Sequence, residues 1–111
     1  MTSWFTKIES LPGFKATILF DRASARIKAS SGTAENEKNL VPVYSQFVNA
    51  KERTAHEHDL NEPFKQMVVT LPDQYHVVQA VEGGMLLFLV LDKERTDMIK
   101  VRAVLEALFQ K

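Results

Sequence analysis

The segment from Gln74 to Leu91 contains two apolar runs separated by a short turn. The runs Tyr75–Val81 and Met85–Leu91 flank Glu82-Gly83-Gly84, and a glycine pair between runs of this kind is typical of a tight β-hairpin. In the second run both alternating sets of side chains are apolar, so that strand must be covered on both faces. Only helices are available as covers in a chain of 111 residues. The hairpin therefore predicts a single sheet between two helical layers.

Hydrophobic periodicity assigns the rest of the chain to three helices and three further strands. Pro12-Gly13 ends the first helix, and Thr96 or Asp92 is the expected N-cap of the last one. The expected helices cover Thr2–Leu11, the region from near Asn39 to Ala55, and Lys93–Lys111. The expected strands cover Phe14–Phe20, Ala25–Ser30 and Phe64–Leu71.

The middle helix is expected to be amphipathic, with Pro42 in its first turn, where proline is tolerated. One arc of this helix is apolar and should pack on the sheet, while the opposite side is polar and should face solvent. The apolar arc comprises Leu40, Val43, Tyr44, Phe47, Val48 and Ala55. The polar side comprises Ser45, Gln46, Asn49, Glu52 and Arg53.

Short loops connect the last three strands, which should therefore form an antiparallel meander. The strand Met85–Leu91 is the most apolar, and we place it centrally beside Phe14–Phe20. Numbered along the chain, the strands of this five-stranded antiparallel sheet then take the order 2-1-5-4-3. The N- and C-terminal helices should cover one face and the middle helix the other, which predicts an α/β fold of the α+β sandwich type.

In this order the third strand lies at an edge of the sheet. Its later part, Met67–Leu71, carries no charge. The only charged residue in the predicted strand is Lys65, near its beginning. A long uncharged edge presents backbone donors and acceptors that proteins rarely leave unpaired. We expect the same strand of a second copy to pair with it across a two-fold axis, in an interface on the order of 1,600 Å². The alternative is a different strand order that places this strand inside the sheet.

The charge balance excludes several classes of function. The 14 Lys and Arg residues match the 14 Asp and Glu residues and are interleaved with them, so no basic patch for nucleic acid or a lipid surface is expected. The absence of cysteine excludes disulfides, thiol catalysis and Cys-ligated zinc. No apolar run approaches the roughly 20 residues of a membrane span. We expect a soluble cytoplasmic protein with one domain over residues 1–111.

The chain shows no catalytic, cofactor or metal signature. His56-Glu57-His58-Asp59 carries metal-ligand residue types, but residues two apart in a helix point in nearly opposite directions, so a solvated helix end is expected. Gly83-Gly84 precedes a strand, whereas a phosphate-binding loop needs a following helix. His76 is expected at the sheet surface and not as a catalytic base. We predict no cofactor and no metal.

With this element order, the chain resembles the roadblock and dynein-light-chain family of small α/β domains. The likeness runs through Leu11-Pro12-Gly13-Phe14 at the end of the first helix, the stretch KQMVVTLPDQYHVVQAVEGGMLLFLVL, and the final DKERTDMIKVRAVLEAL. The chain departs from the family pattern at two places. The turn Asp21–Ser24 lacks a glycine that the family often has, and Pro42 lies where a continuous middle helix is usual. The resemblance implies a roadblock/profilin-like fold.

The resemblance also implies a function without catalytic residues. Such domains are generally homodimers or heterodimers made through the middle helix and the third strand. In bacteria they often accompany small Ras-like GTPases, and in eukaryotes they serve in dynein and in GTPase-activating platforms. Carried over by position, the resemblance implies contact residues Gln46, Asn49, Ala50 and Arg53 on the middle helix, and Gln66, Val68 and Thr70 on the third strand.

Three hypotheses follow, and they belong to different classes of function. The leading one is a non-enzymatic dimeric regulator or scaffold that binds a small GTPase or a related signalling partner. The second is a small-ligand sensor with a five-stranded sheet, which requires an enclosed apolar cavity with converging polar groups. The third is a metal-dependent enzyme that uses His56 and His58, which requires a stoichiometric metal.

Overall fold

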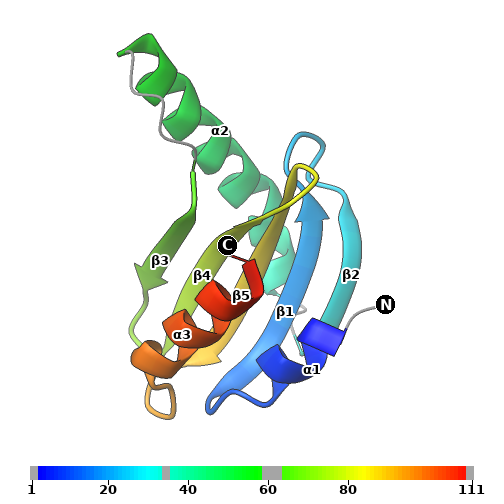
Figure 1. The fold of residues 1–111 in the computed structure, drawn as a ribbon, viewed down its shortest axis with the longest axis vertical. Coiled ribbons are helices and arrows are strands. Elements are labelled where there is room, and N and C mark those ends of the chain that lie inside the picture. The colour runs from blue at the N-terminus through cyan, green and yellow to red at the C-terminus, as the bar shows by residue number, and fades with distance from the viewer. Residues whose placement is uncertain (1–2, 34–35, 59–63, 110–111) are drawn as a thin grey trace.

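The structure is a computed structural model that describes residues 3–33, 36–58 and 64–109. The expected alternation of helices and strands is confirmed, with one additional short 3-10 helix, η1, before the middle helix (Figure 1). The elements are α1 (Ser3–Glu9), β1 (Phe14–Asp21), β2 (Ile27–Gly32), η1 (Glu37–Leu40), α2 (Val41–Glu57), β3 (Gln66–Thr70), β4 (Gln74–Val81), β5 (Met85–Asp92) and α3 (Met98–Phe109).

The strands form one five-stranded antiparallel sheet in the order β2-β1-β5-β4-β3, as the sequence predicts. Helices α1 and α3 cover one face of this sheet, and α2 crosses the opposite face (Figure 1). The C-terminal half of α2 extends past the end of the sheet. The predicted sandwich is therefore confirmed, with β3 at one edge and β2 at the other.

Strand β5 is buried on both faces, which is why it lies at the centre of the sheet. Its residues Leu86, Phe88 and Val90 pack into the core under α2. The alternate residues Leu87, Leu89 and Leu91 pack into the core under α1 and α3. Each fully buried side chain of this size contributes roughly 1.5–3 kcal/mol, so the strand alone accounts for a large share of the stability of both layers.

The β4–β5 turn has the geometry that its glycines predict. Gly83 and Gly84 both have positive φ values, of 80° and 73°. A Cβ atom added at either position would meet nothing within 4 Å, so the requirement for glycine comes from the backbone conformation and not from space.

Several predicted boundaries need correction. Helix α1 ends at Glu9 and not at Leu11, and α2 continues past the predicted Ala55 to Glu57. Strand β2 begins at Ile27, because Asp21 and Arg26 close the preceding turn through a backbone hydrogen bond of 2.8 Å. Helix α3 begins at Met98 and not at Lys93. Its first amides are capped by Asp97, whose Oδ1 accepts hydrogen bonds from Ile99 and Lys100 at 3.0 and 3.4 Å. The predicted caps, Thr96 and Asp92, instead bond to each other within the β5–α3 loop. Strand β3 is also shorter than predicted, at Gln66–Thr70.

Helix α2 begins with Pro42 in its first turn, and Leu40, Tyr44 and Val48 pack on the core, as predicted, but the rest of its buried side differs from the prediction. The amphipathic pattern predicts that Val43 and Phe47 pack on the sheet, yet they are 54% and 51% exposed. Ser45, which the same pattern assigns to the solvent side, is buried. The physical reason lies in polar contacts to the β1–β2 turn, which the next section describes.

Candidate interaction surface

An apolar stripe faces outward on α2. Val43, Phe47 and Ala50 follow one another at helical spacings of four and three residues, and all three are exposed. Only Ile27, Val43, Phe47 and Ile99 are exposed large hydrophobic residues in the described part of the chain, and two of these four belong to this stripe. Scattered exposed apolar residues are common, whereas neighbouring ones mark contact surfaces. We call Val43, Phe47 and Ala50 the α2 stripe.

Polar contacts to Arg22, in the β1–β2 turn, hold α2 in this orientation. The Ser45 hydroxyl donates to the Arg22 carbonyl, and the Asn49 amide donates to the same carbonyl at 3.3 Å. The Arg22 Nε donates to Asn49 Oδ1 at 2.8 Å, and its guanidinium forms an ion pair with Glu52. Ser45, Asn49 and Glu52 therefore point toward the rest of the domain, so the opposite side of the helix faces solvent.

Strand β3 presents a free backbone edge. It pairs with β4 in a register that places Val68 opposite Val77. The Ala80 N–H donates to the Lys65 carbonyl and the Leu71 N–H donates to the Gln74 carbonyl, both at 2.9 Å, so odd-numbered β3 residues hydrogen-bond to β4. Even-numbered residues then direct their backbone groups outward, where no described strand pairs with them. These outward groups belong to Gln66, Val68 and Thr70.

The structure places the helix residues of the predicted contact set on two sides of α2. Gln46, Ala50 and Arg53 are exposed, and Ala50 belongs to the α2 stripe. Asn49 is half-buried and is bonded to Arg22. Asn49 therefore holds the helix in place, and Val43 and Phe47 are exposed residues that the prediction omitted.

The strand residues of the predicted set lie on the other face of the sheet. Val68 packs into the core under α1 and α3. Gln66 and Thr70 are each two residues away along the strand, so their side chains lie on the same face. Gln66 also donates from Nε2 to Gln79 Oε1 at 2.8 Å. Met67 packs on the α2 side of the sheet instead. The helix and strand side chains of the predicted set therefore lie on opposite faces of the sheet.

A signal for the α2 stripe is present in the sequence, but it has two interpretations. Ser45, Asn49 and Glu52 form a stripe at spacings of four and three, as Val43, Phe47 and Ala50 do. Judged by hydrophobicity alone, the α2 stripe is expected to be buried and the polar residues are expected to face solvent. The contacts to Arg22, which is remote in sequence, hold the polar stripe against the rest of the domain.

His76 lies between the sheet and α2, beside the β3 edge. It is 1% exposed and is paired with Val69 of β3, so the prediction of a sheet-surface position is wrong. Its Nδ1 is 2.8 Å from Tyr44 Oη, and its Nε2 is 2.9 Å from Gln74 Nε2. Burial lowers the pKa of the imidazole below its ordinary value of 6.5. The neutral ring is therefore part of the packing between α2 and β4.

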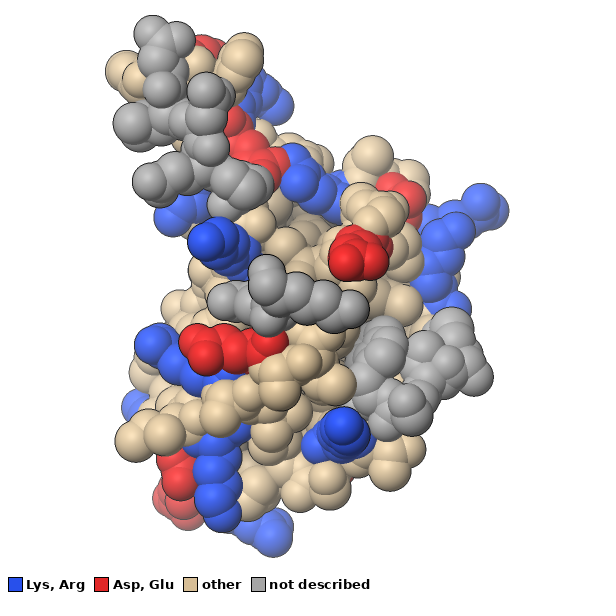
Figure 2. All heavy atoms as spheres, viewed as in Figure 1, with Lys and Arg blue, Asp and Glu red and all other residues tan. Residues whose placement is uncertain are grey.

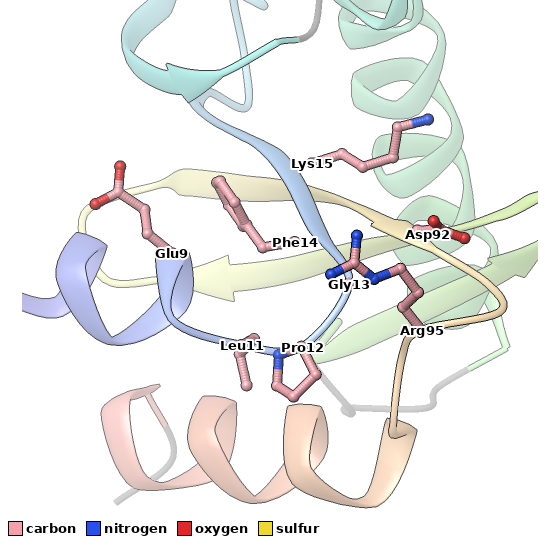
Figure 3. A pocket seen from close by; sticks show the side chains of 8 residues that line it. All are labelled: Glu9, Leu11, Pro12, Gly13, Phe14, Lys15, Asp92 and Arg95. Carbon is pink, nitrogen blue, oxygen red and sulfur yellow. The ribbon is translucent and has the colours of Figure 1, made fainter.

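Two surface depressions adjoin the N-terminal end of β1. Phe14 and Lys15 line both of them. One has a volume of about 240 Å³ and the other about 630 Å³. Both are partly open to solvent and carry charged residues at their margins, and Figure 3 shows the side chains that line the smaller one. The first is lined by Glu9, Leu11, Pro12, Gly13, Phe14, Lys15, Asp92 and Arg95. Neither is the enclosed apolar cavity that the ligand-sensor hypothesis requires.

The histidine segment at the end of α2 lies on the surface. His56 and His58 are both exposed, and Asp59 lies outside the described residues. Within residues 3–33, 36–58 and 64–109, no group of three or more His, Asp or Glu side chains is placed to hold a metal ion.

The described residues include no helix that is both long and apolar enough to cross a membrane. Figure 2 shows Lys and Arg side chains mixed with Asp and Glu over the face that carries α1 and α3. A mixed surface of this kind lacks the single-sign field that steers binding to nucleic acid.

Comparisons with known proteins show which solved structures have a similar fold. No protein-family model matches the sequence, and no curated protein matches it. The roadblock/LC7 domain from Streptomyces avermitilis superposes with a TM-score of 0.75 at 13% identity, covering 94% of this chain and 89% of that one. The gliding protein MglB from Thermus thermophilus gives 0.74 at 17% identity, covering 91% and 76%. An MglB with a tetrameric arrangement gives 0.73 at 18% identity, covering 95% and 82%.

Proposed function

Because this chain has the roadblock/LC7 fold, we propose that it is a non-enzymatic dimeric regulator or scaffold of the cytoplasm. It pairs with a second copy through β3 and α2, and it binds or modulates a small Ras-like GTPase or a related signalling partner. One observation carries the proposal: the unpaired edge of β3 lies on the same domain as an exposed apolar stripe on α2. Unpaired edges and apolar stripes are both features that partners cover.

The GTPase part of the proposal rests on the resemblance described in the sequence analysis. Bacterial roadblock domains often accompany small Ras-like GTPases, and the proteins with a similar fold include MglB. Self-association has the additional support of an MglB that is described with a tetrameric arrangement. The surface itself favours protein binding over catalysis, because its exposed groups are backbone amides and apolar side chains.

The hydrogen-bonding pattern of β3 selects one register for a two-fold pair. Outward groups come only from Gln66, Val68 and Thr70, so these residues must pair with one another. Placing Val68 opposite Val68 of the second copy gives three hydrogen-bonded pairs, since Gln66 then meets Thr70 at either end. Centring the axis on Met67 or Val69 leaves only two such pairs. We therefore assign the axis to Val68.

This register also gives compatible side-chain contacts. On the α2 side of the joined sheet, Met67 of one copy meets Val69 of the other, and both are half-buried in the single subunit. On the opposite side, the two Val68 side chains meet. The two α2 helices then flank the joined strands, with their stripes turned outward from the sheet. An interface of standard size buries on the order of 1,600 Å².

Disulfide trapping tests the proposed pairing, because the chain contains no cysteine. Hydrogen-bonded antiparallel partners have Cα atoms about 5.5 Å apart, which lies within the range that a disulfide bridges. Val68→Cys should therefore form a cross-linked dimer under mild oxidation, measured by non-reducing electrophoresis. Thr70→Cys is the matched control, because its two copies are displaced by about 13 Å along the strand. Failure of Val68→Cys to cross-link, or equal cross-linking of Thr70→Cys, would contradict the register.

A separate experiment tests the partner. Immobilised protein is incubated with small Ras-like GTPases from the same source, loaded with GDP or with a non-hydrolysable GTP analogue. We expect one of them to be retained in a nucleotide-dependent manner, or to change its rate of GTP hydrolysis. Absence of both retention and any change in rate would remove the GTPase from the proposal and leave the scaffold role.

A further inference from the structure

Arg22 joins three parts of the fold: the β1–β2 turn, the β4–β5 turn and α2. Arg22 lies in the β1–β2 turn, and its backbone N–H donates to the Gly84 carbonyl of the β4–β5 turn at 3.0 Å. Its side chain and carbonyl hold α2 through Ser45, Asn49 and Glu52. The arginine side chain is only 32% exposed and the Glu52 side chain 21% exposed, so these contacts are partly shielded from water.

The contacts of Arg22 continue to the edge strand through Glu52. One carboxylate oxygen, Oε1, faces the Arg22 guanidinium. The other, Oε2, accepts the backbone N–H of Phe64 at 2.7 Å. Phe64 lies two residues before β3 begins and packs against the core under α2. The ion pair therefore fixes both the helix and the entrance to β3.

The Arg22 contacts also bear on which side of α2 faces outward. Residues two positions apart lie about 200° apart around a helix. Ser45, Asn49 and Glu52 each follow a member of the α2 stripe by two positions, so turning the polar residues inward turns the stripe outward. Val41, Tyr44 and Val48 of α2 pack into the core in this orientation, so the Arg22 contacts act together with apolar packing in turning Val43 and Phe47 outward.

We propose that Arg22 is a positioning residue that holds α2 in this rotation and joins it to the entrance of β3, so that the α2 stripe and the β3 edge keep a fixed orientation toward each other. The effect on binding rests on the proposed function. The effect on the orientation of α2 does not, because all the contacts lie within one subunit.

Hydrogen exchange tests the positioning role within the subunit. Arg22→Met keeps the apolar length of the side chain and removes its donors, and Arg26→Met is the matched control, because Arg26 lies in the same turn and is exposed. We expect Arg22→Met to speed exchange of the Phe64 amide and the α2 amides at least tenfold, while β5 amides exchange as in the wild type. A purely structural role would speed exchange in β5 as well.

Sedimentation equilibrium tests the consequence for binding. Arg22→Met should raise the dimer dissociation constant at least tenfold, and Arg26→Met should leave it unchanged. Glu52→Gln should also raise the dimer dissociation constant. This second variant tests the inference if Arg22→Met does not fold. Equal exchange at Phe64 in Arg22→Met and Arg26→Met would overturn the inference. A monomeric wild type would instead contradict the proposed function, and the exchange experiment would still decide the role of Arg22.

Discussion

At the scale of single residues, His76 links the sheet to α2 through an ordered set of hydrogen bonds. Lys15 Nζ donates to Gln74 Oε1 at 3.3 Å, which leaves the Gln74 amide nitrogen to donate to His76 Nε2. His76 then carries its proton on Nδ1 and donates to Tyr44 Oη. The rings of Tyr44 and His76 both pack edge-on against Phe88, each with centroids 5.0 Å apart. This arrangement requires a neutral imidazole.

The same arrangement predicts a loss of stability in mild acid. Burial lowers the pKa of His76, and the charges that face it are Glu37 and Asp73, which raise the pKa, and Lys15, which lowers it. The folded-state pKa lies below the unfolded value of about 6.5, so the unfolded state binds more protons as pH falls. The stabilising contribution should be complete above pH 6.5 and be lost as the pH falls from there toward the folded-state pKa.

Urea unfolding at several pH values between 7.5 and 5 measures this contribution. The free energy of unfolding of the wild type should decrease as the pH is lowered. In His76→Gln it should depend less on pH, because the titrating ring is absent. His56→Gln, at an exposed position in α2, should keep the wild-type dependence. Equal pH dependence in the wild type and His76→Gln would show that His76 does not couple protonation to folding.

At the scale of elements, the apolar pattern was sufficient for the strand order. The run Met85–Leu91 is apolar at every position, so it specified a strand covered on both faces and hence a central place in the sheet. The predicted strand order also placed β3 correctly at an edge of the sheet. Both predictions depend on hydrophobic burial, which a sequence displays directly.

Features that depend on polar contacts could not be predicted in the same way. Ser45 is buried against the carbonyl of Arg22, which lies 23 residues earlier in the chain and meets it only in the folded state. The start of α3 depends on which of three nearby polar residues caps it, and the cap is Asp97 and not Thr96 or Asp92. Several nearby polar side chains could cap a helix or bond to a turn, and the sequence alone does not show which of them does so.

The turn between β1 and β2 contains no glycine, although the family resemblance led us to expect one. Ala25 has a φ of 61°, a conformation that favours glycine. The Asp21 carboxylate accepts hydrogen bonds from the Ala23 and Ser24 amides at 2.9 and 3.0 Å, and it supports the turn from within. The departure from the family pattern therefore changes local chemistry and leaves the fold intact.

At the scale of the whole molecule, the two edges of the sheet differ. Strand β2 carries the charged residue Lys28, which is exposed, and charge on an edge discourages pairing with other strands. Strand β3 carries no charge from Gln66 to Thr70. The proposed pairing through β3 would leave only the charged β2 edges exposed, which discourages extension of the joined sheet into a fibre. The molecule as a whole is thus suited to a two-fold dimer.

The mass of the wild-type protein in solution tests this central claim most directly. Sedimentation equilibrium of the 12.6 kDa chain over a range of micromolar concentrations should give the mass of two chains, with dissociation only on dilution. A mass of one chain throughout that range would contradict the account, because the open edge of β3 would then face water without a second copy.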